Sequence, residues 1–172
     1  MKWLRGPRMA MIWTVLRIWL GIQWLEAGVH KVTGGFDATG FVHGAIGKAG
    51  GDHPVVQGWY ANFLEAFALP NIGLFNILIP FGEVLVGVGL IIGAATIPAL
   101  VAGAFMNLNF LLAGTTSTNP VLYTVAILLM VANTAAYYYG ADRILVPYLK
   151  QRMINRRHKH KNTRKPEHIP AH

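Results

Sequence analysis

The segment from Asn71 to Ile97 is the feature that most limits what this chain can fold into. It reads NIGLFNILIPFGEVLVGVGLIIGAATI, which is long enough to cross a bilayer, and Glu83 is the one charged residue within it. A carboxylate at bilayer depth costs about 3 kcal/mol, so it needs a partner and is usually retained for a function. The segment therefore predicts a membrane-spanning helix with a polar site beside it.

Three more apolar stretches accompany this one, and short turns connect the last three of the four. Hydrophobic residues make up 53% of the 172 residues and charged residues 13%, about half the charged share of soluble domains. We therefore expect an all-α integral membrane protein, a four-transmembrane-helix bundle that forms one domain over residues 1–145. The expected spans are Met9–Val29, Ile72–Ala95, Ile97–Gly114 and Val121–Tyr139.

The long connection between the first two spans divides into two parts. Residues 34–54 are rich in glycine, whereas Val55–Leu69 has apolar residues at helical spacing. The second part predicts an extracytoplasmic amphipathic helix between transmembrane helices 1 and 2. It could be a plain hydrophobic lid or a gate for a substrate.

Basic residues are concentrated towards the two ends of the chain. Nine of the fifteen Lys and Arg residues lie in 143–172, and Lys2, Arg5 and Arg8 precede the first span. The positive-inside rule then predicts a multi-pass protein of the plasma membrane with both termini in the cytoplasm. Residues 146–172 are expected to form a basic, disordered cytoplasmic tail on anionic headgroups, so the bilayer rather than nucleic acid is the expected partner.

Polar residues of different spans are expected to meet at a similar depth. At a rise of about 1.5 Å per residue, Arg17, Glu83 and Asn133 lie roughly 16–18 Å from the outer ends of their spans, and Asn107 roughly 10 Å. A guanidinium offers two parallel donors to a carboxylate, so we expect Arg17 and Glu83 to form an ion pair. The pair could lock the bundle or serve a functional site.

One face of the first span carries residues that suit a ligand site. Trp24 could stack on a planar ring or anchor the helix at the membrane interface, and Lys31 ends the face at the outer rim, beside His30. In the third span Asn107 shares a face with Phe110, and its amide could bond another helix or a ligand. The face of the first span consists of Arg17, Gly21, Trp24, Gly28 and Lys31.

The chain contains no cysteine, which excludes disulfides and thiolate ligands for iron–sulfur clusters. No histidine lies within an apolar span, so a haem held between two histidines inside the membrane is not expected. A surface metal site from His43, Asp52 and His53 is a weak alternative, and no metal is expected.

Several motifs, spread over residues 14–145, carry a family resemblance. With them the chain resembles the DoxX family, and within it the DoxD-like subunit of thiosulfate:quinone oxidoreductase. The motifs are the Arg17…Gly21 pattern, Gly28-Val29-His30-Lys31, Pro80-Phe81-Gly82-Glu83 with the glycines that follow it, Met106–Gly114, Ser117-Thr118-Asn119-Pro120 and Gly140-Ala141-Asp142-Arg143.

The resemblance implies a four-helix membrane subunit that passes electrons from thiosulfate to a quinone and joins two thiosulfates into tetrathionate. It also implies a second subunit, or a homo-oligomer, as a partner. On this interpretation Glu83 and Arg17 are catalytic, Phe110 contacts the quinone, and the substrate is bound by Lys31, Trp24, Asn107 and His30. The competing class is a non-catalytic membrane scaffold, a partner-dependent subunit of a quinone or thiol stress response, or a small carrier.

Overall fold

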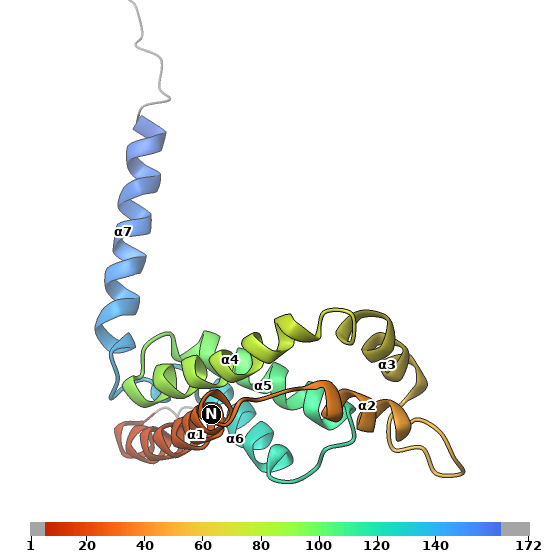
Figure 1. Cartoon of the computed structure of the whole chain (residues 1–172). Coiled ribbons are helices and arrows are strands. Elements are labelled where there is room, and N and C mark those ends of the chain that lie inside the picture. Colours follow the sequence, from red (N-terminus) through yellow and green to blue (C-terminus); the bar gives the residue numbers. More distant parts are fainter. Residues whose placement is uncertain (1–5, 163–172) are drawn as a thin grey trace, which may run out of the picture.

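The computed structural model describes residues 6–162, and within them every regular element is a helix, which confirms the predicted all-α fold (Figure 1). The helices are α1 (Pro7–Gly34), α2 (Thr39–Gly47), α3 (Gly58–Phe63), α4 (Ile72–Ile92), α5 (Thr96–Leu112), α6 (Asn119–Ala132) and α7 (Asp142–Asn162). A π-helical turn, η2 (Leu64–Ala68), continues α3, and a 3-10 turn, Asn133–Ala135, continues α6.

In the part of the chain that the structure describes, α4 is the one helix that is both long and apolar enough to cross a membrane by length and composition. α5 and residues 119–135 are apolar but shorter. α1 has 28 residues, which gives a length of about 42 Å at the usual rise per residue.

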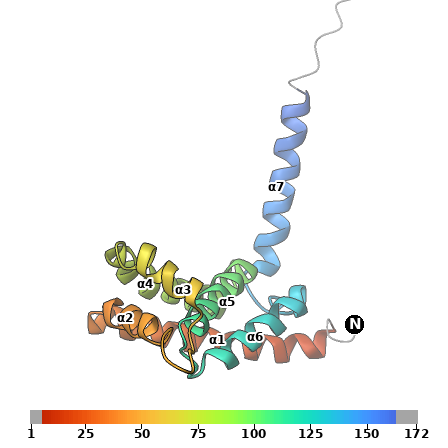
Figure 2. The ribbon, with the colours of Figure 1, turned by 90° about the vertical axis from the view of Figure 1, so that its right-hand side faces the viewer.

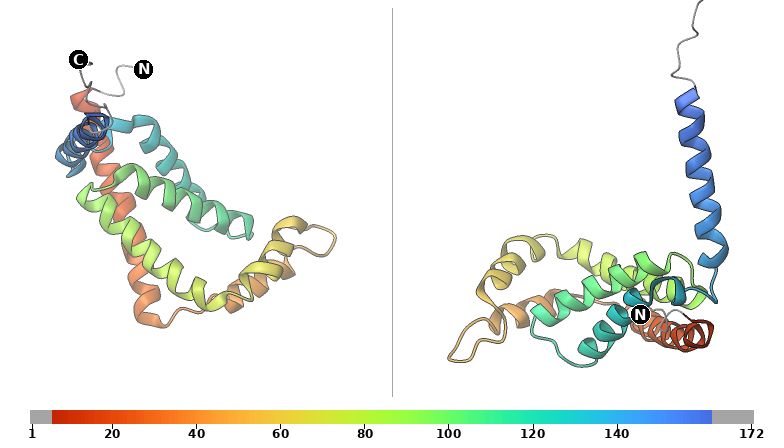
Figure 3. Two further views of the ribbon diagram at one scale, coloured as in Figure 1. Left: turned by 90° about the horizontal axis from the view of Figure 1, so that it is seen from above. Right: turned by 180° about the vertical axis from the view of Figure 1, so that it is seen from behind.

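α1 and α4 run antiparallel with their backbones in contact, as the view from above shows (Figure 3). A Cβ added at Gly87 would stand 2.5 Å from the backbone nitrogen of Leu25, and one at Gly28 would stand 2.7 Å from that of Val84. Real Cβ atoms do not approach backbone so closely, so both positions require glycine. Small residues commonly allow such close packing between membrane helices.

The main core lies between α1, α4, α5 and α6. Leu20, Leu90, Leu100 and Leu129, one from each of these helices, have no exposed surface or almost none. A second, smaller apolar cluster joins α2, α3 and η2 beyond one end of the core, the end that faces the viewer in Figure 2. We call this second cluster, residues 39–68, the outer cap, after the side of the membrane that the sequence predicts for it.

The outer cap contains one helix that the sequence analysis did not predict. α2 lies within the glycine-rich part of the connection. It forms a helix there because Val42 and Ala45 are buried against the rest of the cap. Asp37 accepts hydrogen bonds from the backbone N–H and hydroxyl of Thr39 and from the amide of Asn76. These bonds, chiefly those from Thr39, lower the pKa of the exposed Asp37 carboxyl below its ordinary value.

The opposite end of the molecule holds α7, which runs across the direction of α4 and α5 (Figure 1). The expected disorder from residue 146 is therefore wrong as far as residue 162, and residues 163–172 lie outside the described part. A helix forms because residues 143–162 contain no glycine, their one proline lies near the start, and several are strong helix formers. Asn133, expected in the bundle core, lies exposed where α6 ends.

Candidate functional site

Glu83 and Lys31 form the ion pair at the centre of the candidate site. The Nζ of Lys31 lies 2.9 Å from Oε1 and 2.7 Å from Oε2 of Glu83, so both carboxylate oxygens are bound. The Glu83 side chain is 2% exposed and that of Lys31 is 27% exposed. Lys31 belongs to the last turn of α1, where a cation also meets the partial negative charge of the helix end. The pair thus joins a buried carboxylate to an ammonium group that reaches solvent.

Arg17 does not pair with Glu83, contrary to the sequence-based expectation. Its guanidinium donates to the backbone carbonyl oxygens of Leu90 at 2.7 Å and Tyr139 at 2.9 Å. The reason is the register of the two helices, because α1 continues five residues beyond Val29, to Gly34. Arg17 therefore lies beside the last turn of α4, about two turns of helix from Glu83.

The surroundings of Arg17 tie three parts of the chain together. Gly93, in the left-handed conformation with φ 71°, leaves no room for a side chain against the guanidinium. Asp142, which also attracts Arg17 electrostatically, accepts hydrogen bonds from the backbone N–H groups of Ala95 and Thr96 and so caps α5. In the sequence, Asp142 is conspicuous only as part of the Gly140-Ala141-Asp142-Arg143 motif. Its capping role depends on the fold, which brings the start of α7 to the start of α5.

A cavity of about 480 Å³ lies beside the Lys31–Glu83 pair. Its walls come chiefly from α1, α4 and α5, with contributions from α2, the turn between α5 and α6, and the start of α6. We call it the polar cavity. Five residues singled out in the sequence line it, and Arg17 and His30 do not. The five are Trp24, Lys31, Glu83, Asn107 and Phe110.

Two of these residues have buried polar atoms without a partner in the described part of the chain. They are the amide nitrogen and oxygen of Asn107 and the indole nitrogen of Trp24. Asn107 is completely buried and Trp24 is 3% exposed. Buried polar groups are normally hydrogen-bonded, so unpaired ones at the wall of a cavity indicate a place for water or a polar ligand.

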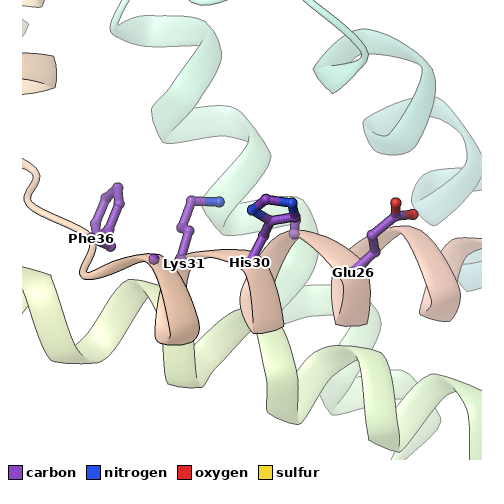
Figure 4. A pocket seen from close by; sticks show the side chains of 6 residues that line it. Glu26, His30, Lys31 and Phe36 are labelled. Carbon is purple, nitrogen blue, oxygen red and sulfur yellow. The ribbon is translucent and has the colours of Figure 1, made fainter.

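His30 lies outside the polar cavity, on the rim of a shallower hollow of about 490 Å³. Figure 4 shows Glu26, His30 and Lys31 rising from one side of α1, with Phe36 beyond them. The ammonium of Lys31 lies 5.8 Å from the centre of the Phe36 ring. Lys31 borders both the hollow and the polar cavity, so it stands where the cavity meets the surface.

The surface metal site considered from the sequence is not formed. Among residues 6–162, no three side chains of the types His, Cys, Asp or Glu converge to hold an ion. His43, Asp52 and His53 therefore do not form the site.

Comparison with known proteins places the chain in a family. The family described as "TQO small subunit DoxD" matches residues 13–165, which is most of the chain and includes every residue of the polar cavity. No curated protein and no solved structure matches the chain.

Proposed function

The chain belongs to the DoxD family, and we propose that it is the small membrane subunit of an enzyme that oxidises thiosulfate and reduces a quinone. In this reaction two thiosulfates join through a new S–S bond to give tetrathionate, and the two electrons released reduce the quinone, which also takes up two protons. The observation that supports this function best is the polar cavity, where an acid–base pair lies beside unpaired amide and indole groups.

Lys31 is the residue proposed to bind thiosulfate. A dianion needs cationic and N–H donors, and the polar cavity offers the Lys31 ammonium together with the amide of Asn107. Lys31 also stands at the mouth, where a charged substrate arrives from water. Because Glu83 accepts two hydrogen bonds from the three donors of the ammonium and balances its charge, thiosulfate must compete with the carboxylate for the cation.

The quinone ring is proposed to lie deeper, against Trp24 and Phe110. Quinone sites are apolar slots with hydrogen-bond donors for the two carbonyl oxygens. The proposed donor is the amide of Asn107, which has no hydrogen-bond partner among the described residues. Glu83 is the proposed proton carrier, because it is the buried carboxyl group beside this slot and proton transfer needs a group within hydrogen-bonding reach.

A membrane location is supported by the outward-facing side chains. Val15 on α1, Leu85 on α4, Phe105 on α5 and Val131 on α6 are each more than half exposed, which water would disfavour and lipid would not. We propose four spans, α1, α4, α5 and α6, with the outer cap on the extracytoplasmic side. α7, which runs across the spans, carries exposed Leu149 and Met153 among basic residues and suits the inner membrane surface.

This topology can be tested by cysteine labelling, since the natural chain has no cysteine. In intact cells, Gly50→Cys in the outer cap region is expected to react with a membrane-impermeant maleimide, and Gln151→Cys on α7 is expected to react only after permeabilisation. Both positions are exposed, so access depends on the side of the membrane. Labelling of Gln151→Cys alone in intact cells would contradict the orientation.

A partner-dependent subunit is the second candidate function. The exposed apolar side chains of α7 could dock on another protein as well as on lipid, and the matched family is described as a small subunit. In this case the polar cavity binds its ligands, but turnover requires the second chain.

Anaerobic turnover of the purified full chain tests the proposal. Thiosulfate and a soluble benzoquinone are supplied together, and quinone absorbance and tetrathionate are measured. Consumption of one quinone for each tetrathionate formed is expected from the catalytic form of the proposal. Binding of both ligands without turnover supports the partner-dependent form, and absence of binding overturns both.

A further inference from the structure

A second cavity, of about 440 Å³, lies between the outer cap and the helices α4 and α5. Its wall is almost entirely hydrocarbon, with Phe63, Phe67, Phe75 and Phe105 among the lining residues. We call it the apolar cavity. Its size falls in the usual range of small-molecule sites, roughly 300–1,000 Å³.

The polar side chains at its wall, Tyr60 and Asn109, are already engaged. The Tyr60 hydroxyl donates to the backbone oxygen and Oδ1 of Asn109, each at 3.1 Å, and the Asn109 amide donates to the carbonyl of Phe105 at 2.8 Å. Burial raises the pKa of Tyr60, so the hydroxyl remains protonated and keeps its role as a donor. The wall of the apolar cavity is therefore hydrocarbon almost throughout, and it suits a hydrocarbon chain rather than a quinone carbonyl or an anion.

The two cavities share part of their walls. Phe41, Ile79 and Phe110 line both of them. The rings of Phe41 and Phe110 meet edge to face, with their centres 6.0 Å apart. Rotation of two aromatic side chains, rather than movement of backbone, would therefore join the cavities into one elongated site with a polar end and an apolar end.

We infer that the apolar cavity holds the hydrocarbon tail of a lipid-soluble quinone whose ring occupies the polar cavity. This inference rests on the proposed function and adds the place of the quinone tail, which lies between the outer cap and the helices α4 and α5. Such a molecule has the same division of polarity as the joined site.

The position of the apolar cavity suits entry from lipid. Among the residues that line it, Phe67 is 50% exposed and Phe105 is 67% exposed. Phe105 faces outward from the middle of α5 and Phe67 from the outer cap, so a tail dissolved in the bilayer can enter sideways. The wall also includes the π-helical turn η2, and π-helical turns are frequent at functional sites.

Gly82→Leu on α4 tests the inference by filling the apolar cavity. A Cβ at Gly82 would meet only the side chain of Met106, at 3.4 Å, so the larger residue can be accommodated and its end projects into the space. Gly73→Leu is the matched control, because it makes the same change on the same helix at a site with nothing within 4 Å. Ala102→Leu fills the apolar cavity from α5 and serves if Gly82→Leu does not fold.

Binding of two probes to the purified full chain in micelles is compared. The probes are a dimethoxy-methyl-benzoquinone with a decyl tail and the same ring without a tail. The leucine side chain would occupy space that the tail needs, so Gly82→Leu is expected to weaken binding of the tailed probe about tenfold and that of the bare ring less than about twofold. Gly73→Leu is expected to change neither.

The outcomes separate the inference from the proposed function. If the wild-type chain binds both probes equally, or if Gly82→Leu and Ala102→Leu leave the tailed probe unaffected, the tail lies elsewhere and the inference alone fails. If decyl alcohol competes as well as the tailed quinone, the apolar cavity is a general acyl-chain site and the inference again fails. If neither quinone binds to the wild type, the proposed function fails as well.

Discussion

Lys31→Met is expected to lower the free energy of unfolding by about 3 kcal/mol, because it leaves the Glu83 carboxylate buried without a partner. Removing one member of a buried ion pair commonly costs about 3–5 kcal/mol, and the lower end is expected because Lys31 is 27% exposed. The measurement is the unfolding free energy of the purified protein in mixed micelles. Lys48→Met is the control, since Lys48 is exposed and its ammonium donates to the backbone carbonyl of Gly114 rather than to a carboxylate.

The second substitution of the pair is expected to restore stability. In Lys31→Met with Glu83→Leu no charge remains to be buried, and replacing a buried ion pair with apolar residues is often neutral or stabilising. The double variant should therefore lie within about 1 kcal/mol of the wild type. Additive losses from the two changes would indicate that the contact between Lys31 and Glu83 contributes nothing to stability.

Glu83→Gln is expected to slow quinone reduction about 100-fold, the lower end of what a positioned proton-transfer group typically contributes. Glutamine keeps the shape and hydrogen bonding of the side chain but cannot accept the proton. Thiosulfate binding should become tighter rather than weaker, because Lys31 no longer faces a competing carboxylate. The rate and the dissociation constant are measured on the same preparation, so that catalysis and binding are separated.

Glu65→Gln provides the control for this prediction. Glu65 lies exposed on η2 and lines neither cavity, so the rate should remain that of the wild type. An unchanged rate in folded Glu83→Gln would show that Glu83 is structural, and the non-catalytic scaffold would then become the better explanation.

The sequence was sufficient to single out five of the residues that line the polar cavity, including the ion pair at its centre. Glu83 is conspicuous because its surroundings are apolar, and the helical spacing of Trp24 and Lys31 places them on one face of α1. Asn107 and Phe110 share a face of α5 for the same reason. Periodicity within a helix depends only on local geometry, and it survives errors of several residues in the ends of the helix.

The register between helices could not be obtained in the same way. The depth of Arg17 relative to Glu83 depends on where α1 and α4 end and on how they slide past each other. Gly28 and Gly87 set that sliding by allowing backbone contact, and their partners across the interface are not encoded in local spacing. The expected Arg17–Glu83 pair failed for this reason, and Lys31 is the partner instead.

α2 and α7 were missed for different physical reasons. The glycines of α2 suggested a loop, but burial of Val42 and Ala45 within the outer cap outweighs the low helix propensity of those glycines. The high charge after Arg143 suggested disorder, although the residues concerned are good helix formers. The composition of a stretch of sequence indicates how exposed to solvent its residues are on average. It does not determine the backbone conformation of that stretch.

The most direct test of the central claim is thiosulfate binding to the double variant Lys31→Met with Glu83→Leu, measured by titration calorimetry with sulfate as the comparison anion. The account predicts a folded protein, as stable as the wild type, whose affinity for thiosulfate is at least about tenfold lower because the ammonium in the polar cavity is gone. A folded double variant that binds thiosulfate as tightly as the wild type would contradict it.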